Sequence, residues 1–375
     1  MIFFPNLDGI RFICFFMVFM VHSLNTNDSV INNNPFHVFV KEFLFASGNL
    51  GVNMFFVLSG FLITYLLISE KDLAGKINIK NFYLRRVLRI WPLYFFCVFF
   101  GFVIFPIIKT TFGEIPNETA QPIYYFFFLS NFDLIRTGGA DSSMLNILWS
   151  VSIEEQFYLI WPLVVSFTRR KYLWLVTIII IIISTIFRIL NSSVSFIESH
   201  TLSAATDLGI GCLTACIAIQ NKETKSTYIK NSKGIYIAAH LFFILVFLSF
   251  KPFNLYYLDF VKRIIFSSSF AFIIYLQCFS NRNLFSLSKL KTISKLGQYT
   301  YGLYCLHMLG ILFSMKIFNR WGEIIFETSN PTEGWNGKKY NTGIDSPQGV
   351  YLCVVKYTSP RGQEFELRSY ANLIR

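Results

Sequence analysis

The chain has 375 residues and a formal net charge of +12, and 54% of its residues are hydrophobic while only 14% are charged. This composition excludes a water-soluble globule with a charged surface and indicates a protein of the lipid bilayer. The basic residues cluster in short loops between apolar runs, as in the cytoplasmic loops of membrane proteins, so the charge does not indicate nucleic-acid binding. Seven cysteines are scattered without a CxxC pair, which predicts neither a disulfide framework nor a metal site.

About nine apolar runs long enough to cross a bilayer lie in the first 313 residues. The first is followed by SLNTND, which favours a retained span over a cleaved signal peptide. Basic loops after the second, fourth, sixth and eighth runs predict a cytoplasmic N-terminus and a periplasmic C-terminal piece. We therefore predict a mainly α fold, a polytopic transmembrane helical bundle in the inner (cytoplasmic) membrane. The runs fall at about 10–25, 50–69, 90–108, 150–168, 172–190, 203–220, 234–250, 258–279 and 297–313.

The last sixty residues differ in character from the rest, because they are polar, turn-rich and β-prone. Strands are predicted at 324–328, 349–358 and 363–375, separated by turns that contain Gly, Asn or Pro. A segment of this length makes at most half of a β-sandwich. We therefore predict two domains, a transmembrane domain at 1–313 and a small partial β-sandwich-like piece at 315–375.

This C-terminal piece resembles the gliding-motility-associated C-terminal domain, the type B sorting domain of type IX secretion, through IFNRWGEIIFET, GWNGK, GVYLCVVKY and the final LIR. The resemblance covers the second half of that domain and implies the type IX secretion machinery as a partner. A sorting domain directs soluble cargo, whereas lipid-embedded helices cannot be released as cargo. One hypothesis is therefore a fusion of two truncated genes, or an assembly or frameshift product, with its junction between about Leu312 and Lys316.

Five stretches of the membrane domain place ionisable or small residues inside apolar sequence: LDGIRFICFFMVFMVH, GVNMFFVLSGFLIT, FYLRRVLRIWPLYF, LWSVSIEEQFYLIWPL and LGQYTYGLYCLH. In this order and spacing they resemble the acyltransferase-3 family of membrane O-acyltransferases. The resemblance stops where the family adds one more span. It implies an enzyme that moves an acyl group, here acetyl, from acyl-CoA to a hydroxyl of a cell-envelope polysaccharide or other glycan. Acyl-CoA is then a co-substrate, and no bound cofactor is implied.

Arg11 and His22 lie within about 20° of one helix face and roughly 16 Å apart along the axis, so they face one cavity or one neighbour. The residues alone also allow a simpler interpretation, with Arg11 as a cytoplasmic flank and His22 as an interfacial residue. The resemblance implies that His22 is catalytic and that Arg11 helps to form the donor site. An imidazole can accept a proton from an acceptor hydroxyl as that oxygen attacks a thioester.

In YLRRVLRI, Arg85 and Arg89 are predicted on one helix face, with Arg86 turned about 100° away. These arginines fit two interpretations. They can be topogenic charge and nothing more, or they can make bidentate contacts with the phosphates of coenzyme A at the cytoplasmic edge of the membrane. The resemblance assigns all three to donor binding.

In WSVSIEEQFY, Glu154 and Glu155 lie at or inside the outer end of a span, where a central carboxylate costs about 3 kcal/mol. Neighbouring residues point about 100° apart, so one of the two faces the interior, and the family pattern selects Glu154 as catalytic. A structural alternative is an acidic residue favoured by a helix N-terminus. Trp149, Ser152 and Tyr158 are predicted to line the same cavity and bind substrate.

Other residues of the motifs have a structural interpretation beside a functional one. His307 is a lone histidine in a span, where it serves either as a helix-to-helix hydrogen bonder or as a second residue that binds substrate. Ser59 and Gly60 are interpreted as small residues that let helices pack closely.

Two other functions stay open. Buried Arg, His and Glu can line the pathway of a transporter, which predicts inverted repeats in the two halves of the sequence, and inspection finds none. The other alternative is a nonfunctional chimera whose parts fold poorly.

Overall fold

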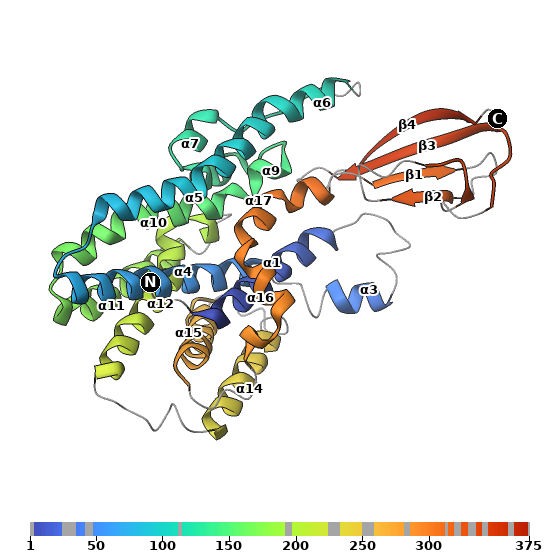
Figure 1. Ribbon diagram of the computed structural model, residues 1–375. Helices are drawn as coiled ribbons and strands as arrows, with labels where there is room; N and C mark the ends of the chain where they lie inside the picture. The colour runs from blue at the N-terminus through green and yellow to red at the C-terminus, as the bar shows by residue number, and fades with distance from the viewer. Residues whose placement is uncertain are drawn as a thin grey trace.

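The computed structural model describes residues 4–24, 35–41, 48–111, 115–191, 197–223, 233–249, 259–280, 286–311, 314–318, 324–328, 335–339, 344–358 and 364–373. Helices occupy the chain up to residue 311, and a small sheet follows (Figure 1). The predicted fold class, a mainly α bundle followed by a small β piece, is confirmed.

Each predicted apolar run is mostly helical where the structure describes it. Six of these segments are long and apolar enough to span a membrane, namely Pro5–Ser23, Leu50–Ala74, Ile79–Thr111, Arg170–Leu190, Thr201–Asn221 and Phe260–Phe279. The chain is therefore a multi-pass membrane protein, and the count of about nine spans stays a prediction. The helices are α1 (Pro5–Ser23), α4 (Gly48–Ala74), α5 (Ile79–Phe99), η2 (Phe100–Ile104), α6 (Phe105–Thr111), α10 (Leu148–Phe167), α11 (Leu173–Leu190), α12 (Thr201–Glu223), α14 (Lys233–Ser249), α15 (Asp259–Phe279), α16 (Lys291–Gln298) and α17 (Thr300–Ile311).

Short helices connect the long ones. Between α6 and α10 the polar loops are tied together at Glu118, whose carboxylate accepts backbone N–H groups of Ala120 at 2.8 Å and Asp141 at 3.2 Å. Lys109 forms an ion pair of 2.8 Å with Asp141. These contacts hold the loops in a compact cap beside the start of α10. The short helices are α3 (Pro35–Phe39), α7 (Pro122–Phe126), α8 (Ser130–Thr137), α9 (Ser143–Asn146), η3 (Arg170–Tyr172), η4 (Ile197–Ser199) and η6 (Leu287–Lys289).

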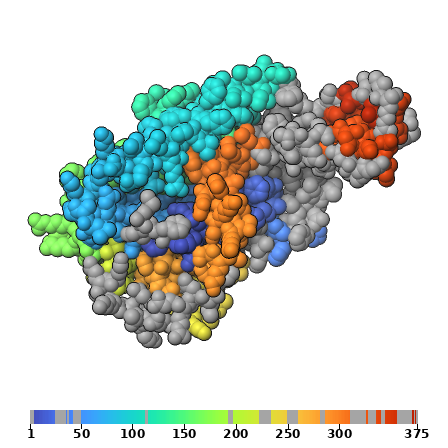
Figure 2. Space-filling model, viewed as in Figure 1, coloured from blue at the N-terminus to red at the C-terminus, as the bar shows by residue number. Residues whose placement is uncertain are grey.

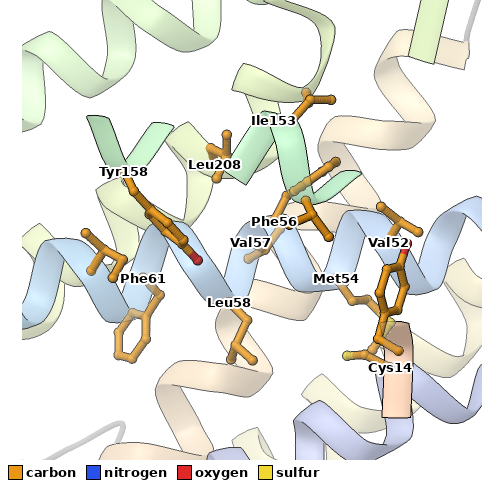
Figure 3. Close-up of a cluster of buried hydrophobic side chains, with 14 of the residues drawn as sticks. Cys14, Val52, Met54, Phe56, Val57, Leu58, Phe61, Ile153, Tyr158 and Leu208 are labelled. Carbon is orange, nitrogen blue, oxygen red and sulfur yellow. The ribbon is translucent and has the colours of Figure 1, made fainter. Parts of the chain in front are cut away.

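Helix α4 is the centre of the bundle and lies directly against α12. A Cβ atom at Gly60 would collide with the carbonyl oxygen of Leu208, and one at Gly211 would collide with that of Val57. Small residues allow this close approach of two backbones in lipid, so the interpretation of Gly60 as a packing residue is confirmed. Figure 3 shows Tyr158 of α10, Leu208 of α12 and side chains of α4 such as Phe56 and Val57 in one buried cluster.

The last helices close the bundle against the first. A Cβ at Gly297 would meet the carbonyl carbon and oxygen of Asp8, so α16 lies directly against α1. The Tyr301 hydroxyl donates a hydrogen bond of 2.9 Å to the carbonyl of Ile90 in α5. In Figure 2 these helices form an orange band along the blue and cyan of α1 and α5. The predicted run at 297–313 is divided, since α16 ends at Gln298 and α17 starts at Thr300.

The C-terminal sheet is antiparallel and has the strand order β2-β1-β3-β4. Three of its strands match the predicted ones, and the fourth, β1 at Ser314–Phe318, was not predicted. Its small core contains Ile325, Phe326 and Tyr351. The domain boundary between 313 and 315 stays a prediction. The strands are β1 (Ser314–Phe318), β2 (Ile324–Thr328), β3 (Gly349–Thr358) and β4 (Glu364–Leu373).

Candidate active site

A cavity of about 190 Å³ lies among α1, α4, α5, α10, α16 and α17. Its walls combine charged, hydroxyl-bearing and apolar side chains from segments that are far apart in the sequence. Of the predicted site residues, five line it: Arg11, Arg86, Arg89, Glu154 and Tyr158. Residues of the motifs on α1, α5 and α10 therefore line the same cavity.

Glu154 is held at the wall of the cavity by hydroxyl groups. Ser59 Oγ of α4 donates a hydrogen bond of 2.5 Å to Glu154 Oε1. The Tyr158 hydroxyl lies 3.2 Å from Ser59 Oγ and 3.3 Å from Glu154 Oε2. Glu155 is turned to another neighbour and accepts a hydrogen bond of 2.9 Å from Trp91 Nε1. The two adjacent carboxylates thus have different surroundings, as their angular offset on a helix requires.

Positive charge exceeds negative charge along the cavity wall, where three arginines face one carboxylate. Arg11 donates a hydrogen bond of 2.6 Å to Asp8, one turn earlier in α1. Arg86 lies over the Tyr158 ring, with its guanidinium carbon 5.2 Å from the ring centroid. Arg89 makes no hydrogen bond or ion pair within the described part of the chain. A site of this charge suits an anionic ligand.

The structure places the three predicted donor-site arginines of α5 differently with respect to the cavity. Arg85 does not line the cavity, is exposed, and has a long ion pair of 3.9 Å with Glu70. Arg86 lines it instead, together with Arg89. Residues three apart share a helix face as well as residues four apart, and only the packing of α5 decides between them.

His22 and His307 lie together outside the cavity. Their ring centroids are 5.3 Å apart, with His22 in the last turn of α1 and His307 on α17. Tyr304 connects the two places, because its side chain lines the cavity and its ring centroid lies 5.8 Å from that of His307. No hydrogen bond in the described residues joins either histidine to Glu154.

Most of the chain matches a known family. The model of the acyltransferase domain, acyltransferase-3, covers residues 4–336. The chain belongs to the acyltransferase-3 family. A second model, the CHU_C type IX secretion signal domain, covers residues 305–371, so the two matches overlap at 305–336. Both resemblances predicted from the motifs are confirmed.

Curated relatives of this acyltransferase-3 chain include two bacterial proteins. The O-acetyltransferase OatA of Staphylococcus aureus (strain NCTC 8325 / PS 47) is 29% identical over 263 residues, which are 64% of this chain and 40% of the relative. The peptidoglycan O-acetyltransferase OatA of Listeria monocytogenes is 29% identical over 277 residues, which are 69% of this chain and 41% of the relative. The chain thus spans less than half the length of these relatives. No solved structure matches it.

Two predicted substrate-binding residues of this family member lie away from the cavity. Ser152 is fully buried, and its hydroxyl is 2.7 Å from that of Ser130 and 3.3 Å from that of Tyr94. It therefore joins α10 to α5 and α8. Trp149 packs edge-on against Phe56, with ring centroids 6.2 Å apart. Neither residue lines the cavity, so their predicted contact with substrate has no support from this geometry.

Several cavity residues were missed by the sequence-based prediction. Ser59 was interpreted as a packing residue, yet it hydrogen-bonds Glu154. Tyr304 and Ser150 close one end of the cavity, and their hydroxyl oxygens are 2.7 Å apart. The quoted motifs contain all three, so the signal was present: a hydroxyl group inside an apolar run needs a partner.

Proposed function

We propose that the chain is an integral-membrane O-acyltransferase that moves an acetyl group from acetyl-CoA to a hydroxyl of a cell-envelope glycan. The observation that carries this proposal is the convergence of Arg11, Arg86, Arg89 and Glu154 on one cavity of a family member. A glycan acceptor agrees with the names of the relatives, one of which is a peptidoglycan O-acetyltransferase. We place the chain in the inner membrane with its N-terminus in the cytoplasm, because its basic loops alternate with the spans.

The donor binds at the arginines. Coenzyme A is polyanionic, and guanidinium groups contact phosphate oxygens in a bidentate manner. Arg89 supports this role most directly, because it is exposed at the cavity and has no acidic partner among the described residues. The thioester end then extends along α1 toward His22, which lies roughly 16 Å from Arg11 along the helix axis.

The acyl group is transferred at His22. The acceptor oxygen attacks the thioester carbonyl carbon, the C–S bond breaks, and the hydroxyl proton passes to the imidazole and then to the leaving thiolate. Glu154, with Ser59 and Tyr158, forms a polar wall along the path of the thioester arm. A relay through an acyl intermediate uses the same residues.

The C-terminal sheet has a separate role in this proposal. Its match to a type IX secretion signal domain supports the secretion machinery as a partner on the periplasmic side. The overlap of the two family matches at 305–336 favours a second candidate, a fusion whose halves come from different genes. Sequencing of the locus across the codons for 312–316 tests this, and one continuous reading frame with its own transcript would refute a fusion artefact.

Binding of acetyl-CoA tests the donor site. With the full chain in nanodiscs, Arg86→Gln and Arg89→Gln should each raise the Kd for acetyl-CoA by about 10-fold or more, since a hydrogen bond to a charged group contributes about 1.5–3 kcal/mol. Arg169→Gln is the matched control, because Arg169 is exposed in the loop after α10 and does not line the cavity. Arg85→Gln tests whether donor binding follows the lining of the cavity or the motif. A tenfold rise in the Kd for acetyl-CoA in this variant would support the motif, which assigns Arg85 to donor binding as well. Equal Kd values for all four variants and the wild type would refute this donor site.

Acetylation of glycans tests the reaction. Cells that express the wild-type chain should carry base-labile acetyl groups on envelope glycans, and cells that express His22→Ala should not. Equal acetylation in both would remove His22 from the mechanism. Absence of acetylation in both, despite acetyl-CoA binding, would favour the transporter or the chimera.

A further inference from the structure

The tautomer of His307 follows from the hydrogen bond that its ring makes with the backbone. Its Nδ1 lies 2.6 Å from the carbonyl oxygen of Tyr304. A carbonyl can only accept, so Nδ1 carries the hydrogen of a neutral imidazole and Nε2 keeps its lone pair. His307 therefore offers one free ring atom, and that atom is a hydrogen-bond acceptor.

This acceptor atom is buried and has no hydrogen-bond partner in the described residues. His307 is 7% exposed, and Nε2 is one of the few buried polar atoms left without a partner there. Such an atom costs free energy unless a ligand or water satisfies it. The aromatic rings of Phe15, Phe19 and Tyr304 surround the imidazole with centroids 5.8–6.3 Å away. The two phenylalanines have no polar atom, and the Tyr304 hydroxyl pairs with Ser150 at 2.7 Å.

The nearest ring is that of His22, at 5.3 Å between centroids. No hydrogen bond joins the two imidazoles among the described contacts, so each is available to a ligand. Because the two rings are close, one acceptor molecule can contact both imidazoles, each through its own hydrogen bond.

We propose that His22 and His307 together bind the acceptor, with the reacting hydroxyl on His22 and a second hydrogen-bond donor of the same sugar on Nε2 of His307. This assignment rests on the proposed function. His307 is then a residue that positions the acceptor and selects for sugars with a donor group beside the reacting hydroxyl. Rejection of acceptors without that donor follows, because they leave a buried lone pair unsatisfied.

The test compares His307→Asn with His307→Gln in the full chain in nanodiscs, with radiolabelled acetyl-CoA as donor and a soluble peptidoglycan disaccharide as acceptor. Asn keeps a side-chain N–H near the Tyr304 carbonyl and has no atom where Nε2 lies. Gln can place its amide oxygen near that position. We expect His307→Asn to raise the KM for the acceptor by at least about 10-fold at an unchanged Kd for acetyl-CoA, and His307→Gln to recover part of this loss.

His240→Asn is the matched control. The Nδ1 atom of His240 makes the same kind of contact, 2.7 Å from the carbonyl of Tyr236, but it lies on α14 and outside the proposed site. Its KM for the acceptor should equal that of the wild type, and thermal unfolding should show that all three variants fold.

The outcomes separate this inference from the function on which it rests. Unchanged acceptor KM in His307→Asn, with transfer intact, overturns the inference and leaves the proposed function standing. A loss of kcat alone, with KM unchanged, also overturns it, because His307 would then act as a base. No transfer and no acetyl-CoA hydrolysis by the wild-type chain, although it binds acetyl-CoA, overturns both.

Discussion

Two clusters of charged residues lie inside the helical bundle, and they differ in what surrounds the charges. Around the cavity, three arginines and one carboxylate face an open volume. In the second cluster, Arg263 of α15 and Asp207 of α12 are 3% and 0% exposed and form a direct ion pair. Arg263 Nε donates a hydrogen bond of 2.9 Å to Asp207, and Ser267 Oγ donates one of 2.5 Å to the other carboxylate oxygen.

The second cluster is balanced in charge. Arg188 of α11 donates a hydrogen bond of 2.7 Å to Ser203 and has an ion pair of 3.5 Å with Glu198. Glu198 also lies 3.8 Å from Arg263, so two arginines face two carboxylates. These contacts join α11, α12 and α15. The comparison teaches that a buried charge alone does not mark a site: paired charges hold helices together, whereas an excess of one sign around a cavity indicates a ligand.

The largest effect that tests this comparison is on stability. Arg263→Met should lower the free energy of unfolding in mixed micelles by about 3–5 kcal/mol, because it leaves Asp207 charged and buried without its partner. The double variant Arg263→Met with Asp207→Leu should recover most of the loss. Folded Arg263→Met should bind acetyl-CoA as tightly as the wild type. If it instead weakens binding as much as Arg89→Gln does, the two clusters act as one site and the comparison fails.

A smaller effect is expected at the cavity, on catalysis rather than stability. Glu154→Gln should lower the rate of acetyl transfer about 100-fold, the usual contribution of one strong electrostatic contact. Glu155→Gln is the matched control, since Glu155 pairs with Trp91 and does not line the cavity. Its rate should stay within about threefold of the wild type. Similar losses in the two variants would mean that carboxylates in this turn act through the helix and not through the cavity.

The sequence predicts much of the fold because a bilayer requires long apolar helices with charge at their ends. It also predicts which residue types line the cavity, since Arg11, Arg89 and Glu154 are costly in lipid and lie in recognisable motifs. It does not predict which side of α5 meets its neighbours, so the motif alone does not separate Arg86, which lines the cavity, from Arg85, which does not. The helix period allows both arrangements, and packing selects one of them.

Contacts between distant segments are the other part that sequence patterns do not contain. Ser59 and Gly60 are adjacent, yet one hydrogen-bonds Glu154 and the other packs on α12. The pairing of Arg263 with Asp207 joins residues 56 positions apart, and neither lies in a quoted motif. Strand β1 pairs with β3, from Ser314 with Lys356 to Phe318 with Leu352, and no local pattern around β1 predicts that pairing.

The smallest effect concerns a carboxylate outside both clusters, that of Glu118. Backbone N–H groups hold it, and none of these partners carries a positive charge. Glu118 lies outside the spans and accepts three backbone N–H groups, from Ala120, Asp141 and Ser142. Burial raises its pKa above the usual value, although the hydrogen bonds act in the opposite direction. The folded chain therefore holds this proton at a pH where the unfolded chain has lost it.

The sign of the pH dependence follows from that difference. As pH rises from about 4.5, the ordinary glutamate value, through the raised folded-state pKa of Glu118, the stability that the protonated form contributes is lost. The difference in free energy of unfolding between wild type and Glu118→Gln, measured in mixed micelles across this range, should therefore shift in favour of the variant as pH rises. A shift in favour of the wild type would mean that the three N–H groups outweigh burial, and that hydrogen bonds alone can stabilise a buried carboxylate in this cap, as an arginine does for Asp207.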